Sequence, residues 1–312
     1  MKIRILLLLV VLGLAALILP NVRALYEGVF FYLRDAVAYN ATDVTPINRA
    51  GRYASLYDLV AMRNAERLQY LKHRLGALNV VVDEMPIPDS NLTNLFVRFG
   101  DGGDLTVFSS HYDKLFDDAN YQGASDNTAA VSVMLAAIEE LARRGNADKR
   151  AFLFTGEEET GLRGASVFVE YARAKKIVIR EIINFDNLGR GKLAIRPSAE
   201  IPGFVFTLPF VGDFAYDGRT LQRFENLRQD DVQANERLTQ ALLRAQPDLV
   251  VYERFTAVSD SNVFQRSGID TVAMSGDNMY YLEQTWHTYA DRIEWLDERN
   301  LDRAYELILS LR

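Results

Sequence analysis

The sequence predicts an α/β fold: a three-layer sandwich in which a mostly parallel or mixed central sheet lies between helices. Short apolar runs rich in Val, Ile and Phe recur at strand length along the chain. Runs with apolar residues at helical spacing separate them. This regular alternation of strand and helix is typical of a sheet that helices cover on both faces.

The predicted elements follow one another from residue 55 onward. Residues 55–78 have apolar side chains at helical spacing, with Gly76 as a stop, and residues 127–145 form a second clear helix that ends at Gly145. Residues 198–235, rich in Phe, Gly and Asp, are the least regular and read as an insertion. The other predictions are strands at 78–85, 94–100, 105–110, 150–156, 180–186, 193–197, 249–255 and 270–276, and helices at 164–176, 238–245, 261–268 and 300–312.

The N-terminus has a basic start followed by an apolar run. Lys2 and Arg4 precede residues 5–19, which carry no polar side chain and end at Pro20. This order is typical of a signal peptide, and the run is shorter than the ~20 residues of an ordinary membrane-spanning helix. The alternative, a buried helix at the start of the domain, fits poorly with flanking cations and no polar face.

The chain is therefore expected to have three parts. Residues 1–24 are a signal peptide or an uncleaved membrane anchor, residues 25–74 an N-terminal helical or linker segment, and residues 75–312 the main domain. We expect an extracytoplasmic protein, periplasmic or secreted, or one that residues 5–19 associate with the membrane. The sequence assigns no oligomeric state.

Composition excludes several classes of function. The net charge of -7 argues against nucleic-acid binding, which needs a concentrated basic patch. There are no cysteines, so disulfides, thiolate metal ligands and a cysteine nucleophile are excluded. Neither a G-x-G-x-x-G motif after a first strand nor a G-x-S-x-G elbow is present. Of the three histidines, His73 lies between two cations and is expected on the surface, which leaves His111 and His287 for chemistry.

Acidic and imidazole side chains follow several predicted strands at the point where each strand ends. His111 and Asp113 follow the strand at 105–110, and Asp186 follows the strand that ends in "INF". Because the carboxyl ends of parallel strands meet at one edge of a sheet, we expect these side chains to lie together. The other members of this set are Asp126 before the helix at 127–145, Glu157 and Glu158 after the strand at 150–156, and His287 after the strand at 270–276.

Carboxylates and imidazoles without thiolates form a ligand set that suits zinc, manganese or iron. Five ligands exceed what one tetrahedral zinc takes, but they suit two ions if one carboxylate bridges them. The adjacent glutamates then have separate roles. If Glu158 binds metal, Glu157 stays unligated and is available as a base, and nearby cations stabilise carboxylates that would otherwise repel one another.

Five stretches follow one another along the chain: "SHYD", "GASDNTAAV", "LFTGEEETGLRGAS", "NFDNLG" and "WHTYAD". Together they resemble the co-catalytic di-zinc aminopeptidases of the bacterial leucyl and Streptomyces type. That family also contains glutamate carboxypeptidase and glutaminyl cyclase relatives, and the resemblance covers residues 75–312, making them a zinc peptidase domain. The resemblance implies that His111 and Asp186 hold one zinc, that Glu158 and His287 hold the other, and that Asp126 bridges the two ions. It also implies that Glu157 is the general base and that Asp113 orients His111. It also implies a cis peptide bond between Asp126 and Asn127.

The function that this resemblance implies is a metal-dependent exopeptidase for peptide substrates, most simply an aminopeptidase with two zinc ions. Two alternatives stay open: a glutaminyl cyclase-like acyltransferase with one zinc, and an inactive membrane-tethered binding module. Carboxypeptidase or dipeptidase action and the preferred N-terminal residue also stay open. Secondary candidates are Tyr280 or Tyr281 as an oxyanion donor, with Asp260 and Asp291 as supporting residues.

Overall fold

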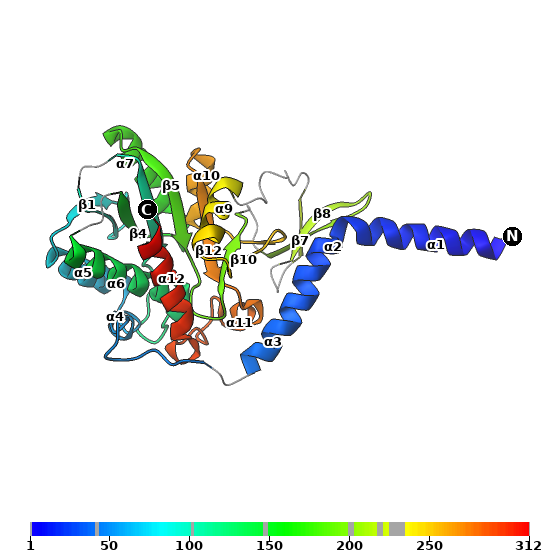
Figure 1. Cartoon of the computed structure of the whole chain (residues 1–312), viewed down its shortest axis with the longest axis horizontal. Coiled ribbons are helices and arrows are strands. Elements are labelled where there is room, and N and C mark those ends of the chain that lie inside the picture. The colour runs from blue at the N-terminus through cyan, green and yellow to red at the C-terminus, as the bar shows by residue number, and fades with distance from the viewer. Residues whose placement is uncertain are drawn as a thin grey trace.

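The computed structural model describes residues 2–40, 44–100, 103–145, 149–198, 203–216, 221–224 and 235–311 (Figure 1). Its centre is an eight-stranded sheet in the order β1-β2-β4-β3-β5-β12-β6-β10. The inner strands β4, β3, β5 and β12 are parallel to one another. The pairs β1–β2, β2–β4 and β12–β6 are antiparallel, and β10 pairs parallel with β6. The predicted mixed sheet is confirmed. Its strands are β1 (Val81–Pro86), β2 (Thr93–Arg98), β3 (Leu105–His111), β4 (Arg150–Thr155), β5 (Ile179–Phe185), β6 (Leu193–Arg196), β10 (Val250–Val251) and β12 (Thr271–Gly276).

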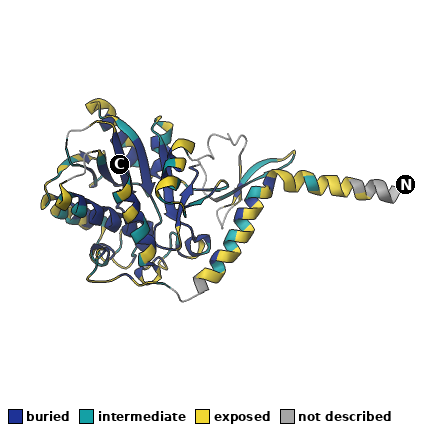
Figure 2. Cartoon of the chain, in the orientation of Figure 1, coloured by how far each residue is buried: buried dark blue, intermediate teal, exposed yellow. Residues whose placement is uncertain are grey.

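Helices cover both faces of this sheet, because successive strand residues point to opposite sides. Phe108 and Ile183 face one core together with α5 (Asn64–Gly76), α6 (Ala129–Arg144), α9 (Glu236–Ala245) and α12 (Glu298–Ser310). Their neighbours Val107 and Ile182 face a second core with α7 (Arg163–Lys175) and α10 (Asp260–Arg266). The three-layer arrangement follows from this period-two alternation (Figure 2).

The helix predicted at 55–78 is divided into α4 (Ser55–Leu59) and α5. Arg63 has extended backbone angles, and the Glu66 carboxylate accepts a hydrogen bond from its N–H at 2.8 Å, which starts a new helix. Residues of both helices, including Leu56 and Leu71, lie in the main core. The part of the chain from residue 44 to 76 therefore packs with the domain that follows it.

The N-terminal segment is helical throughout its described length. It consists of α1 (Lys2–Ile18), a 3-10 turn η1 (Leu19–Asn21), α2 (Val22–Leu25), a π-helical turn η2 (Tyr26–Phe31) and α3 (Tyr32–Asn40). The direction changes near Pro20: α1 projects away from the body, and α2 to α3 run back along it (Figure 1). Within this segment Leu9–Ala38 is long and apolar enough to cross a membrane, by length and composition.

A second, smaller sheet lies between this segment and the main sheet. Its order is β11-β7-β8-β9, with β7 (Gly203–Leu208), β8 (Gly212–Tyr216), β9 (Leu221–Phe224) and β11 (Phe255–Thr256). The strand predicted at 249–255 is thus shared between two sheets. Residues 199–202, 217–220 and 225–234 of the predicted insertion lie outside the described residues. The elements that remain are η3 (Ala124–Thr128), α11 (Met279–Thr285) and η4 (Ile293–Trp295).

Candidate metal centre

Four of the five predicted ligands meet at the carboxyl edge of the main sheet. His111 is the last residue of β3, a strand whose residues are all buried, and Asp186 directly follows β5. Asp126 lies in η3 before α6, and His287 follows α11. The predicted meeting of these side chains is explained by the parallel pairing of β3 with β4 and β5, which aligns their carboxyl ends.

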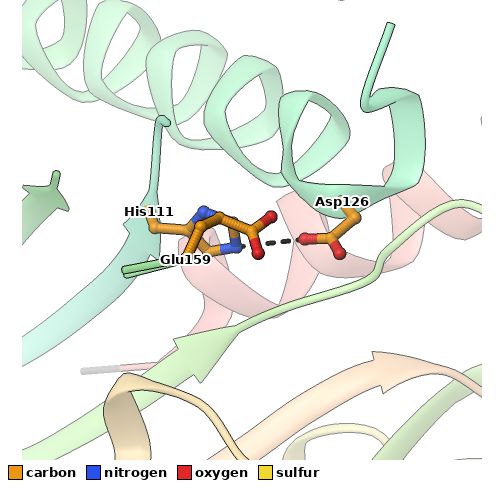
Figure 3. A group of neighbouring side chains, drawn as sticks. All are labelled: His111, Asp126 and Glu159. Carbon is orange, nitrogen blue, oxygen red and sulfur yellow. Dashed lines mark ion pairs between the residues drawn. The ribbon is translucent and has the colours of Figure 1, made fainter. Parts of the chain in front are cut away.

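Asp126 lies between the two histidines. Its Oδ1 is 3.1 Å from His111 Nε2, and its Oδ2 is 3.4 Å from His287 Nε2. Asp186 Oδ1 approaches His111 Nε2 at 3.6 Å. His111, Asp126 and Glu159 each offer a ligand atom within 4.8 Å of the others (Figure 3). A carboxylate with one oxygen toward each imidazole has the geometry of a bridging ligand.

The three consecutive glutamates point in different directions. The carboxylate of Glu159 lies 3.3 Å from His287 Nε2, the position that the sequence analysis gave to Glu158. The carboxylate of Glu157 accepts hydrogen bonds from the Ser90 and Thr160 hydroxyls. Glu157 has a positive φ of 57°, and its carboxylate also lies 3.6 Å from the Arg163 guanidinium. The geometry therefore favours roles shifted by one residue.

Glu158 lies between these two. Its backbone N–H donates to the Asp113 carboxylate, and its charge helps to raise the pKa of His111. In the part of the chain that the structure describes, no hydrogen bond holds this carboxylate. Because three identical residues follow one another, the acidic run alone does not predict which two of them face the metal ligands.

Asp113, expected from the resemblance to orient His111, contacts both that histidine and the glutamate turn. His111 Nδ1 lies 3.1 Å from the Asp113 carbonyl oxygen and 3.6 Å from its carboxylate, which leaves Nε2 directed at the cluster. The same carboxylate accepts the N–H groups of Glu158 and Glu159, each at 3.3 Å. Asp113 thus joins the first histidine to the glutamate turn.

Asp291 has a larger role than the capping function considered from the sequence. Its carboxylate accepts the backbone N–H groups of Ser125 at 2.8 Å and Asp126 at 3.0 Å. The Tyr281 hydroxyl also points to it at 3.4 Å. The Asp126–Asn127 peptide bond is cis. Asp291 therefore fixes the turn that carries the central carboxylate, a contact that sequence spacing could not show.

The other secondary candidates have structural partners. The Tyr280 ring packs edge-on against Tyr32, with ring centroids 5.3 Å apart. Asp260 accepts a hydrogen bond from the Thr155 hydroxyl at 2.5 Å, and burial raises its pKa to about 7. His73 is exposed on α5, as expected.

The charges at the site fit bound cations. Burial and the nearby Asp126 raise the pKa of Glu159 to about 7, and burial raises that of Glu158 well above its usual value. Burial opposes the charged form of His111, yet Glu158 and the nearby carboxylates of Asp113, Asp126 and Asp186 still raise its pKa well above normal. Within the described residues, His111 Nε2 and Glu159 Oε1 are buried without a hydrogen-bond partner. Carboxylates crowded in this way are stabilised by divalent cations, and oxygen and imidazole ligands suit zinc.

A cavity of about 760 Å³ opens beside the cluster and reaches Asp186. Its walls come from the N-terminal segment, the second sheet, β12 and α11, and most of them are apolar. Arg196 is the one Lys or Arg side chain that lines it among the described residues. The Arg196 guanidinium donates to Ser275 Oγ at 2.6 Å and to the Gly276 carbonyl at 3.2 Å, and it lies 4.4 Å from the Phe255 ring centroid.

Comparison with known proteins identifies the family. The profile described as peptidase family M28 matches residues 94–312. No curated protein matches the chain by sequence.

Three solved structures share the fold. The Legionella pneumophila LapA aminopeptidase is 14% identical with a TM-score of 0.63, over 89% of this chain and 73% of that one. A Zn-dependent exopeptidase from Parabacteroides distasonis is 14% identical with a TM-score of 0.58, over 85% and 98%. The Tannerella forsythia glutaminyl cyclase is 15% identical with a TM-score of 0.61, over 85% and 98%. Because the family profile covers more than half of the chain and includes the residues of this site, the protein belongs to peptidase family M28 and is a zinc metallopeptidase.

Proposed function

We propose that this metallopeptidase is an aminopeptidase that uses two zinc ions to remove the N-terminal residue of peptides. The observation that carries the proposal is the Asp126 carboxylate, which presents one oxygen to each of two histidines. His111 and Asp186 are the ligands on one side of Asp126. His287 and Glu159 are the ligands on the other, in place of the Glu158 expected from the sequence.

The general base in this proposal is Glu158. Glu157, the residue expected from the sequence, has its carboxylate bonded to two hydroxyls and lies 3.6 Å from the Arg163 guanidinium, which favours the ionised form. Among the described residues, no hydrogen bond holds the Glu158 carboxylate, and burial raises its pKa well above the usual value. A raised pKa suits a carboxyl group that takes up a proton and then returns it.

Zinc held at this site supplies a Lewis acid for the scissile carbonyl and makes water an effective nucleophile at neutral pH. Glu158 takes a proton from the attacking water and returns it to the leaving amine. Asp113 keeps His111 oriented, and Asp291 keeps the turn at Asp126 in place. Tyr281, one of the expected oxyanion donors, directs its hydroxyl to Asp291 and so supports the same turn.

The cavity favours substrates with an apolar N-terminal side chain. Phe204, Phe255, Met279 and Leu282 are among its walls, and burying a large apolar side chain contributes about 1.5–3 kcal/mol. Arg196 gives a second possibility, an acidic N-terminal residue, because a buried guanidinium binds carboxylates strongly. Comparing the hydrolysis of apolar and acidic aminoacyl-anilides distinguishes these two substrate preferences.

Glutaminyl cyclisation is the second candidate function. The fold is shared by an aminopeptidase and a glutaminyl cyclase, so the fold alone favours neither. The presence of Asp126 between two histidines favours the two-metal peptidase. Two measurements distinguish the two functions: the number of zinc ions per chain, and the turnover of a peptide that begins with glutamine. One ion with cyclisation of this peptide would indicate a cyclase, and two ions with release of the N-terminal residue would indicate an aminopeptidase.

The proposed location is extracytoplasmic, with α1 as the membrane-associated part. Most of the α1 side chains that the structure describes are exposed and apolar (Figure 2). At 1.5 Å per residue this helix is ~25 Å long, close to the lower limit for crossing a bilayer.

The test of the proposed function is a panel of Leu-, Phe-, Ala-, Glu- and Gln-anilides, assayed before and after zinc removal by a chelator. We expect release of aniline from at least one apolar substrate, loss of this activity with chelator and recovery on adding zinc. Absence of hydrolysis by the zinc-loaded full-length protein would contradict an aminopeptidase.

A further inference from the structure

The N-terminal helical segment is attached to the body through buried polar contacts as well as apolar ones. The Glu27 side chain is fully buried, and its two oxygens accept the backbone N–H groups of Glu253 and Arg254, each at 2.8 Å. Arg23 donates to Glu27 at 2.7 Å and to the Val251 carbonyl at 3.0 Å. A buried carboxylate is tolerated only with such partners, so these contacts define where the segment lies.

Two further contacts secure the ends of the same segment. Asp35 is buried, and its carboxylate accepts the N–H of Met279 at the start of α11 at 2.8 Å. Asn21 exchanges two hydrogen bonds with the backbone of Thr207 in β7, at 2.5 and 2.6 Å. Residues 21–35 are therefore fixed at three separate points, on both sheets and on α11 (Figure 1).

The face of the segment between these points lines one side of the cavity. Gly28 and Tyr32 line it, and a Cβ atom on Gly28 would lie 3.4 Å from the Phe204 ring. The Tyr32 hydroxyl donates to Glu283 at 2.6 Å. Asp186 lines the same cavity, so a single space connects the metal residues with the N-terminal segment.

We propose that residues 21–38 form a permanent wall of the substrate cavity and determine its selectivity for large apolar N-terminal residues. The inference rests on the proposed aminopeptidase function. It means that the segment continuous with the apolar helix α1 is part of the enzyme's specificity site. A substrate side chain that enters the cavity packs against Gly28 and Tyr32 as well as against the second sheet.

The experiment uses the full-length, zinc-loaded protein and two wall variants. Gly28→Leu adds a side chain that projects toward Phe204 and occupies the cavity, and Tyr32→Ala removes part of the wall. We expect each to lower kcat/KM for Phe-anilide at least ten-fold while Ala-anilide changes less than three-fold. Leu33→Ala is the matched control, because Leu33 is the next residue along and its side chain is exposed. The control should leave both substrates within two-fold of the wild type.

Zinc content and binding of phenylalanine amide, measured by calorimetry, complete the test. Zinc content should stay at the wild-type value, and binding of phenylalanine amide should weaken in Gly28→Leu while alanine amide is unaffected. Equal losses of kcat/KM for large and small substrates, or no loss for either, would contradict the proposal that the segment determines selectivity. If the wild type hydrolyses no anilide, the proposed function fails, and the binding measurements still decide whether the segment lines the cavity.

Discussion

The metal cluster and the cavity beside it are built in opposite ways. The cluster consists of His and acidic side chains at the ends of β3, β4 and β5, before α6 and after α11. The cavity consists mostly of aromatic and aliphatic side chains from elements at both ends of the chain, including residue 28 and residue 286. Most residues of the proposed metal centre lie in local motifs at strand ends, whereas the cavity depends on how distant elements pack.

This difference implies two kinds of mutational effect. Changes in the cluster should lower turnover of every substrate or remove metal. Changes in the cavity should alter the ranking of substrates and leave zinc in place.

The largest effect should come from the glutamate that is proposed as the base. Glu158→Gln is expected to lower kcat about 10²–10⁴-fold for all substrates, the usual contribution of general acid–base catalysis, while zinc content is unchanged. Glu157→Gln is the matched control and should retain activity within three-fold. A large loss in Glu157→Gln with normal turnover in Glu158→Gln would restore the assignment made from the sequence.

Removal of a proposed ligand should affect metal as well as turnover. Glu159→Gln takes a charged oxygen from the side of His287 and is expected to reduce bound zinc toward one ion per chain, with a loss of activity at limiting zinc. Zinc is measured by atomic spectroscopy after dialysis. Wild-type zinc content at every free zinc concentration would exclude Glu159 as a ligand.

A residue that only positions the cluster should have an intermediate effect. Asp291→Asn replaces one of the two oxygens that accept the N–H groups of Ser125 and Asp126 by a donor. Loss of such support typically costs about 10–100-fold in metal affinity or activity. We expect excess zinc to restore part of the activity, which would not occur if the variant were unfolded. Unchanged zinc affinity would show that the turn is held by other contacts.

In the cavity, Arg196→Met should change the substrate ranking without changing zinc content. The substitution removes the one cation that lines the cavity in the described part of the chain. We expect kcat/KM for Glu-anilide to fall at least ten-fold relative to Leu-anilide. An equal loss of kcat/KM for both substrates would show that Arg196 affects turnover in general, as cluster residues are expected to do. The two regions would then not have separate mutational effects.

The smallest expected effect concerns stability alone. Lys114 is buried, and its ammonium donates to the carbonyls of Asp118 and Tyr121 at 2.8 and 2.7 Å. Burial, followed by the nearby Arg67, lowers its pKa to about 7. Between this pH and the unfolded value near 10.4, the unfolded chain binds more protons. The free energy of unfolding should therefore rise with pH in this window, by up to about 1.4 kcal/mol per pH unit from this group.

Lys114→Met should flatten this slope, as measured by urea unfolding from pH 6 to 10. Lys175→Met, at an exposed lysine on α7, is the control that removes a cation without removing a buried one. Equal slopes in the wild type and Lys114→Met would contradict a lowered pKa.

Much of the fold followed from the sequence because strands and helices alternate with distinct periods. The strand ends also predicted that His111, Asp126, Asp186 and His287 meet. For "EEE" the sequence predicted Glu158 as a ligand and Glu157 as the base, whereas the contacts of the three carboxylates support the proposal that these roles belong to Glu159 and Glu158. The cavity was not predictable, because the hydrogen bonds of Glu27 and Asp35 join residues far apart in the chain and carry no local pattern.

The two histidines have very different surroundings. His111 ends a strand that is paired on both sides, and its side chain is 2% exposed, whereas the side chain of His287 is 27% exposed and stacks on Trp286 in a loop. In the proposed two-ion site, the ion on the His111 side would have an immobile imidazole ligand, whereas the ion on the His287 side would have one that can swing outward. Metal exchange should then proceed from the His287 side while the sheet stays intact, so the lifetime of the bound ion and the lifetime of the folded chain are set by separate barriers.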